Sequence, residues 1–236
     1  MAGQDVEFAS NGGTATGYLA VPDSGRGRGV IVIQEWWGLN NQIRRTADEI
    51  ARNGFVALAP DFFHGQKATE PDEAGKLMMA LNIDQTARDA RGAAEFLVGH
   101  AAVDGPRVGV IGYCMGGQLA LLAATVEPDV IGAVVDMYGV HPNVKPDFSK
   151  MQAAALLLFA EKDSFVTAEV RQALEDQLRQ AGVRYQSHTY PGVDHAFMND
   201  ERPEVYDPNS AQDAWRRTID FLRGELSSSA AGARGG

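Results

Sequence analysis

Short apolar runs alternate with amphipathic segments along most of the chain. Continuous apolar runs, which are typical of strands buried on both faces, occur at residues 30–35, 55–60, 107–112, 131–139 and 154–163, and a half-exposed strand is predicted at 183–191. Helices are predicted at residues 40–55, 84–98, 116–125, 167–182 and 210–226. This alternation predicts an α/β fold, in which a mostly parallel sheet has helices on both faces.

The N-terminal segment has a different pattern. Residues 6–9 and 14–21 are two short strand-like stretches joined at "SNGG", which is a strong turn signal. We expect a hairpin at an antiparallel edge of the sheet. Residues 61–81 are irregular and predict one short helix. With no internal repeat, residues 1–226 are predicted to form a single domain, and the small and polar residues 227–236 a flexible tail.

Composition and charge exclude several classes of protein. The 236 residues are 44% hydrophobic, which is enough for one well-buried core. The net charge is −10 with no cluster of lysine and arginine, which argues against a nucleic-acid partner. A single cysteine cannot form an internal disulfide, the first residues lack the pattern of a signal peptide, and no apolar run approaches the roughly 20 residues of a membrane span. We therefore expect a cytoplasmic protein without a membrane partner.

The only cysteine, Cys114, lies in "GVIGYCMGGQLAL", between a predicted strand and a predicted helix. Glycines at 112, 116 and 117 flank it, which matches the pattern of a nucleophile on a tight strand-to-helix turn, with cysteine in place of serine. Such a turn also places the thiol beside the positive end of a helix, which favours the thiolate. A lone cysteine usually fills space in a core. The strand–turn–helix context instead predicts a nucleophile.

A thiol nucleophile needs a base, and in this kind of fold the acid and then the histidine follow the nucleophile along the chain. His64 and His100 precede Cys114, His141 precedes the best acid candidate, and His188 lies within a predicted strand. His195 lies in the loop between the last strand and the last helix, where a catalytic loop is expected. We therefore predict His195 as the base.

The acid is expected to follow a strand between Cys114 and His195. Asp163 comes where the run "ALLLFAEKD" ends, although aspartate is also common there as a cap. Asp136 is embedded in "AVVDMYG", and Asp194 is adjacent to His195 and poorly placed to reach its ring. Asp163 is the predicted orienting acid.

Several segments together carry a family resemblance over nearly the whole chain. The stretches "IVIQEWWGLN", "ALAPDFFHG", "GYCMGG", "FAEKD" and "GVDHAFMND" resemble the dienelactone hydrolase (carboxymethylenebutenolidase-like) family of the α/β-hydrolase fold. The resemblance implies a catalytic triad of Cys114, Asp163 and His195. It also implies that Glu35 contacts the cysteine in the resting enzyme and helps to control its ionisation, and that the backbone N–H groups of Trp36 and Met115 form an oxyanion hole.

The substrate pocket departs from the family pattern. The family holds its substrate carboxylate with two arginines, but the position four residues after His195 is Asn199, and the segment before the long helix has Lys67 and Lys76 instead of an arginine. A lysine does not replace a bidentate arginine. Arg202 lies nearby in the sequence without an assigned role.

Three functions remain open from the sequence. The first is hydrolysis of an ester or lactone through an acyl-thiol intermediate, of the carboxymethylenebutenolidase type that serves aromatic-compound degradation. The second is a broad cysteine-type carboxylesterase or thioesterase that does not act on dienelactone, and the third is a non-catalytic ligand sensor. We expect a small-molecule substrate, no cofactor, no metal ion, and a monomer or weak homodimer.

Overall fold

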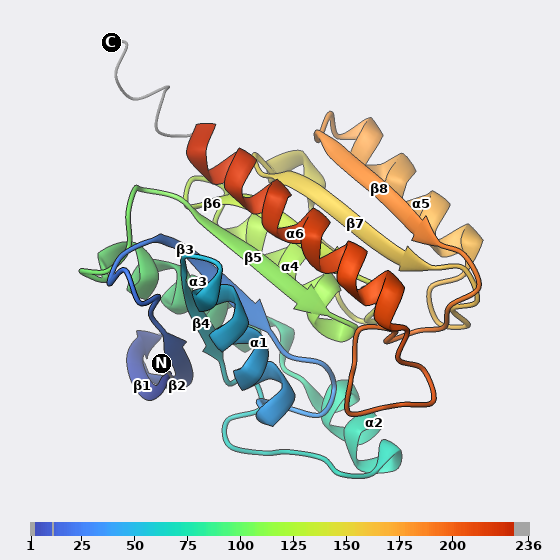
Figure 1. The fold of residues 1–236 in the computed structure, drawn as a ribbon, viewed down its shortest axis with the longest axis horizontal. Coiled ribbons are helices and arrows are strands. Elements are labelled where there is room, and N and C mark those ends of the chain that lie inside the picture. Colours follow the sequence, from blue (N-terminus) through green and yellow to red (C-terminus); the bar gives the residue numbers. More distant parts are fainter. Residues whose placement is uncertain (1–2, 11, 229–236) are drawn as a thin grey trace.

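The computed structural model describes residues 3–10 and 12–228, and its described part is built around one eight-stranded sheet (Figure 1). The strand order is β1-β2-β4-β3-β5-β6-β7-β8. The strands are β1 (Gln4–Ser10), β2 (Gly13–Ala20), β3 (Arg28–Ile33), β4 (Phe55–Pro60), β5 (Val108–Tyr113), β6 (Ile131–Met137), β7 (Ala154–Ala160) and β8 (Tyr185–Tyr190). β1 pairs antiparallel with β2, and β2 pairs antiparallel with β4. All pairs from β4 to β8 are parallel, which confirms the predicted sheet and its hairpin edge.

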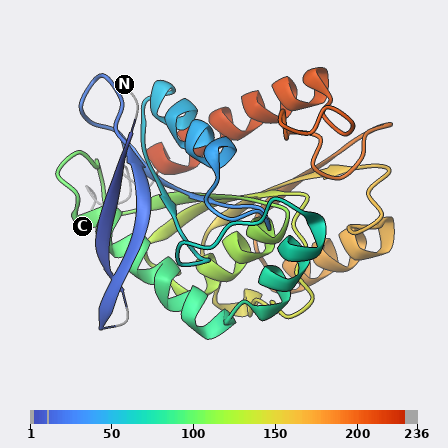
Figure 2. The ribbon, with the colours of Figure 1, turned by 90° about the horizontal axis from the view of Figure 1, so that it is seen from below.

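Helices cover both faces of the sheet. Figure 2 shows α1 (Asn41–Arg52) and α6 (Pro208–Ser228) on one face. The opposite face carries α3 (Ile83–Gly99), α4 (Met115–Val126) and α5 (Ala168–Gln180). Each face buries its own apolar core, because both sides of the parallel strands are apolar. The short helix predicted within residues 61–81 is α2 (Pro71–Ala80), and a 3₁₀ turn, η1 (Phe148–Lys150), precedes β7.

Several strands end earlier than their apolar runs predicted, and for β3 and β7 this affects residues of the predicted site. β3 ends at Ile33, whose last pairing partner is Gly112, and β7 ends at Ala160. Glu35 and Asp163 therefore lie in the loops that follow these strands, beyond the last ladder pairs.

At the other end of the chain, α6 includes residues 227 and 228 of the predicted tail, and residues 229–236 lie outside the described residues.

Candidate active site

Cys114 occupies a sharp turn between β5 and α4. Its backbone has φ 54° and ψ −125°, a conformation that non-glycine residues rarely adopt. Its N–H donates to the Met137 carbonyl at 3.0 Å, and its own carbonyl accepts from Gly117 at 2.9 Å and Val140 at 3.2 Å. These bonds tie the turn to the end of β6 and to the first turn of α4, which offsets the backbone strain.

The glycines around Cys114 are required by close backbone approaches. A methyl group on Gly112 would overlap the Gly116 carbonyl, and one on Gly116 would overlap the Gln34 carbonyl. The glycines thus let α4 begin directly against β5 and against the end of β3. The predicted strand–turn–helix geometry at Cys114 is confirmed in the structure.

Asp163 and His195 form a direct pair. The Nδ1–H of His195 donates to Asp163 Oδ2 at 2.7 Å. The other carboxylate oxygen, Oδ1, accepts from the backbone N–H groups of Phe165 at 2.8 Å and Val166 at 2.9 Å. Asp163 is buried and fixed on both oxygens, so it orients the imidazole. Nε2 is then the ring nitrogen that is not bonded to Asp163.

The His195 imidazole also interacts with Cys114. Burial lowers the pKa of His195, but hydrogen bonds with Asp163 and Cys114, together with their charges, outweigh it and raise the pKa to about 10. For Asp163, burial raises the pKa, while the hydrogen bond and charge of His195 overcome this effect and leave the pKa below its ordinary value. The three residues predicted from the sequence are therefore brought together in the order Cys114, His195, Asp163.

The raised pKa of His195 predicts a particular titration. At neutral pH the ring should remain protonated, with an NMR titration midpoint near 10. Because the folded-state pKa lies above the unfolded value of 6.5, the corresponding stabilisation is complete below about pH 6.5 and is lost as the pH rises through about 10. His188 is an internal control, since burial and the charge of Arg217 lower its pKa. A His195 midpoint at or below 6.5 would contradict this arrangement.

The other acid and histidine candidates do not join this pair. Asp136 is fully buried at the end of β6, which raises its pKa to about 7, and its carboxylate lies against the backbone of Gly117 and Gly139. His188 lies in β8, with its ring against Tyr190. His141 is held by Asn143 N–H at Nδ1 and faces the Met78 carbonyl with Nε2.

Trp36 and Met115, the residues of the implied oxyanion hole, lie on adjoining elements. Met115 is the first residue of α4, so its N–H has no acceptor within the helix. Trp36 lies in the loop after β3, where Gly38 N–H donates to the Glu35 carbonyl at 3.3 Å. The close approach of Gly116 to Gln34 brings this loop beside the start of α4. An oxyanion hole needs two backbone donors on such adjoining segments, and the assignment of Trp36 and Met115 to it stays a prediction.

Glu35 has partners that the sequence did not reveal. Its side chain is 2% exposed, and its Oε2 accepts from Asn199 Nδ2 at 2.9 Å while its Oε1 lies 3.4 Å from the Tyr138 hydroxyl. Burial raises the pKa of Glu35, and four neighbours oppose that rise, namely His195, Asn199, Arg202 and Tyr138. Asn199 also accepts from Glu201 N–H, so both ends of its amide are engaged. The position of the family's arginine is thus occupied by a residue that holds Glu35.

Tyr138 was missed by the sequence reasoning. It follows β6, is fully buried, and has φ 44°, a second left-handed residue near Cys114. Its ring packs edge-on against His195, with centroids 5.0 Å apart. The only signal in the sequence was its place at the end of a buried strand beside β5, which gave no reason to prefer it.

The lysines and the nearby arginine do not form an evident carboxylate clamp. Lys67 and Lys76 are exposed. Arg202 is bound to Glu204, with Nε 2.8 Å from Oε1. Phe62, Phe63 and Phe197, which belong to the segments "ALAPDFFHG" and "GVDHAFMND", are buried in the core.

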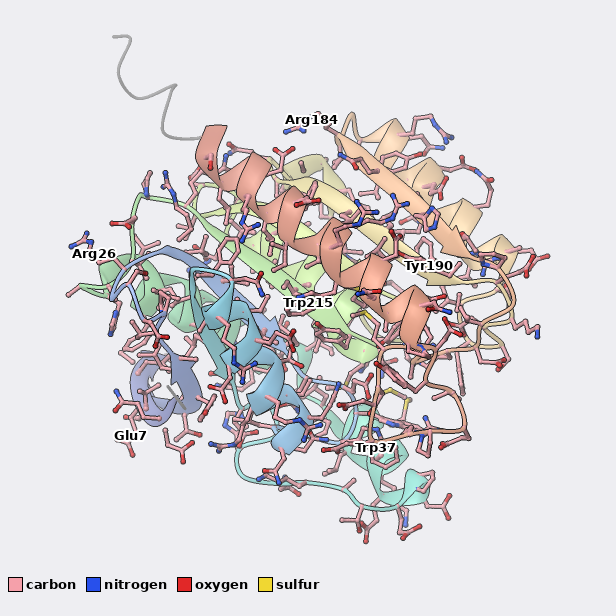
Figure 3. The ribbon with its side chains drawn as sticks, in the orientation of Figure 1. Glu7, Arg26, Trp37, Arg184, Tyr190 and Trp215 are labelled. Carbon is pink, nitrogen blue, oxygen red and sulfur yellow. The ribbon has the colours of Figure 1, made fainter. Side chains whose placement is uncertain are left out.

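Two cavities formed by described residues do not include Cys114. One of about 570 Å³ lies between α1 and α6 and includes Tyr113 and Trp215, and Figure 3 marks Trp215 between these helices. Another of about 190 Å³ lies against α2 and α3. Neither is lined by Cys114 or His195, and Cys114 is only 8% exposed.

The described residues lack two kinds of feature. Residues 3–10 and 12–228 contain no cluster of three or more histidine, cysteine, aspartate or glutamate side chains that could hold a metal ion. Within the same ranges, no helix has the length and hydropathy needed to cross a membrane.

A family model and two relatives show which known proteins this chain is similar to. Residues 15–226 match the model of the dienelactone hydrolase family. The chain is 40% identical to "Protein usf" of Aquifex pyrophilus, covering 94% of this chain and 98% of that protein. It is 36% identical to a putative carboxymethylenebutenolidase of Aquifex aeolicus, with the same coverage.

A solved structure extends this likeness to the fold. The crystal structure of a putative dienelactone hydrolase from Klebsiella pneumoniae superposes with a TM-score of 0.82 at 26% identity, covering 94% of this chain and 99% of that one. The family model, the relatives and the fold agree, and the chain belongs to the dienelactone hydrolase family of ester and lactone hydrolases, with the α/β-hydrolase fold.

Proposed function

We propose that this protein hydrolyses carboxylic esters or lactones through an acyl-thiol intermediate on Cys114. The observation that carries the proposal is the Asp163–His195 hydrogen bond of 2.7 Å, formed by an imidazole that also interacts with Cys114 on its strained turn. This is the arrangement of nucleophile, base and orienting acid that nucleophilic catalysis requires.

Acylation begins with the Cys114 thiolate. A protonated imidazole beside a cysteine stabilises the thiolate, which attacks the carbonyl carbon of the substrate. The carbonyl oxygen becomes an oxyanion, and the backbone N–H groups of Trp36 and Met115 are the proposed donors that stabilise it. As the tetrahedral species collapses, the bond to the leaving oxygen breaks and His195 gives its proton to that oxygen.

In deacylation, His195 acts as a base and a water molecule is the attacking group. His195, now neutral, removes a proton from a water molecule that attacks the thioester carbonyl. The acid product leaves, and the sulfur departs as a thiolate beside the reprotonated imidazole. In the lactone case the product is a single hydroxy or keto acid, because the leaving oxygen stays attached to the acyl chain.

Glu35 is proposed to influence this cycle through charge. A carboxylate here favours the imidazolium of His195, since the two interact electrostatically. Its bonds to Asn199 and Tyr138 hold it in place while the charge at Cys114 changes.

One observation favours the second candidate, a carboxylesterase or thioesterase that prefers uncharged substrates. Asn199, at the position of a family arginine, is neutral and cannot pair with a substrate carboxylate through charge. It is also buried, and its amide is already bonded to Glu35 and to Glu201 N–H. Glu35 itself offers no cation either, and burial raises its pKa.

The test is a comparison of kcat/KM for phenyl acetate and for dienelactone. We expect the neutral ester to be hydrolysed with the higher kcat/KM. A strong preference for the anionic lactone would instead support the carboxymethylenebutenolidase reaction. Inactivity towards both, together with a Cys114 that resists alkylation at neutral pH, would support a non-catalytic ligand sensor.

A further inference from the structure

Phe165 is an exposed aromatic side chain beside the proposed base. It is 58% exposed, whereas large apolar side chains on the surface are otherwise few in the described residues. Its ring lies edge-on to the His195 ring, with centroids 5.1 Å apart. An exposed phenyl ring next to a reactive imidazole is available to a bound substrate.

The backbone fixes Phe165 relative to the reacting groups. Its N–H donates to Asp163 Oδ1 at 2.8 Å, and the next residue, Val166, donates to the same oxygen and is fully buried. Tyr138 also contacts the His195 ring, but it is fully buried. Of these two rings, Phe165 is therefore the one that a ligand can reach from solvent.

The direction of proton transfer identifies the part of the substrate that lies here. His195 Nδ1 is bonded to Asp163, so Nε2 is the nitrogen that gives the proton to the leaving oxygen. That oxygen must come within hydrogen-bond distance of Nε2, and the group attached to it then lies beside the His195 ring. The acyl part instead lies at Cys114 and the backbone donors of Trp36 and Met115.

We propose that Phe165 selects the leaving group, favouring esters of apolar and especially aromatic alcohols. This inference rests on the proposed function, because it uses His195 as the donor to the leaving oxygen. A phenyl leaving group gains apolar burial and an aromatic contact against Phe165, which a methyl leaving group cannot make. Water replaces the alcohol before deacylation, so the contact acts only on acylation.

The test is the variant Phe165→Ala, measured on three esters. Phenyl acetate and methyl acetate share an acyl group, and phenyl acetate and phenyl butyrate share a leaving group. We expect kcat/KM for phenyl acetate to fall about tenfold, and that for methyl acetate to stay unchanged. The ratio of the two phenyl esters should also stay unchanged, because Phe165 does not contact the acyl chain.

Val170→Ala is the matched control, since Val170 is another exposed apolar residue, on the nearby helix α5, without a role in the site. It should leave all three values unchanged. The pH profile of kcat/KM should be the same in Phe165→Ala and in the wild type, which shows that the Asp163–His195 pair is intact.

Two results would overturn the proposal. An equal loss on phenyl and methyl acetate, with a shifted pH profile, would mean that Phe165 only supports Asp163. A change in the ratio of acetate to butyrate would place the acyl chain at Phe165 instead. Failure of the proposed function gives a different result, namely a wild-type enzyme that hydrolyses none of the three esters, or full activity in a variant without Cys114.

Discussion

Replacing Cys114 with alanine is expected to reduce kcat/KM for phenyl acetate by about 10³-fold or more. The reason is that the sulfur forms the covalent bond to the acyl group, and no other residue brought to the turn carries a nucleophile in its place. His195 and Asp163 would remain, but general-base attack by water without the thiol is a much slower route.

The alanine variant should still fold. Its Cβ occupies the same position as that of cysteine at φ 54°, so no new backbone strain arises. The lost sulfur leaves a small void, which we expect to reduce the free energy of unfolding by only about 1 kcal/mol, measured by urea denaturation. A drop in activity with retained stability therefore separates chemistry from folding.

A second measurement gives an independent readout. The chain has a single cysteine, so mass spectrometry of an iodoacetamide-treated protein reports Cys114 without ambiguity. We expect one label per wild-type chain at neutral pH and none in the alanine variant. Activity close to that of the wild type in Cys114→Ala would sink the acyl-thiol mechanism, whatever the labelling shows.

Most of the fold could be predicted because it depends on local patterns. Apolar runs such as Val108–Tyr113 predict buried strands, and "SNGG" predicts the β1–β2 turn, without reference to distant residues. The ends of β3 and β7 were less predictable, since they depend on where the neighbouring strand stops pairing.

The proposed site was predictable in part, for a similar reason. Cys114, Asp163 and His195 follow a fixed order along the chain, and each lies in the turn or loop after a strand, so position alone indicates them. Asn199 and Tyr138 act through side-chain contacts with Glu35 that no spacing encodes. The role proposed for Phe165 could not be predicted from the sequence either, because it depends on the exposure of its ring beside His195.

Replacing Asp163 with asparagine is expected to lower kcat for ester hydrolysis by about 10³- to 10⁴-fold. The two oxygens of Asp163 have different partners, and this determines how an asparagine would be oriented. Oδ1 accepts two backbone N–H groups, from Phe165 and Val166, and only an oxygen can take that place. The amide nitrogen must then occupy the Oδ2 position, 2.7 Å from His195 Nδ1.

This orientation forces the wrong tautomer on His195. The asparagine N–H donates to Nδ1, so Nδ1 becomes an acceptor and the single proton of the neutral ring moves to Nε2. A ring with its proton on Nε2 cannot accept a proton from the thiol or from the attacking water. The asparagine also lacks the negative charge that helps to raise the pKa of His195, so its NMR titration midpoint should fall well below the value of about 10.

Asp194→Asn is the matched control, because it makes the same chemical change in the neighbouring exposed residue. It should leave kcat and the His195 midpoint unchanged. Both backbone bonds to Oδ1 survive in Asp163→Asn, so the variant should remain folded, and its urea-unfolding curve should confirm this. Wild-type kcat in Asp163→Asn, with His195 still protonated at neutral pH, would show that another group orients the imidazole, and Asp136 at the end of β6 would be the next residue to test.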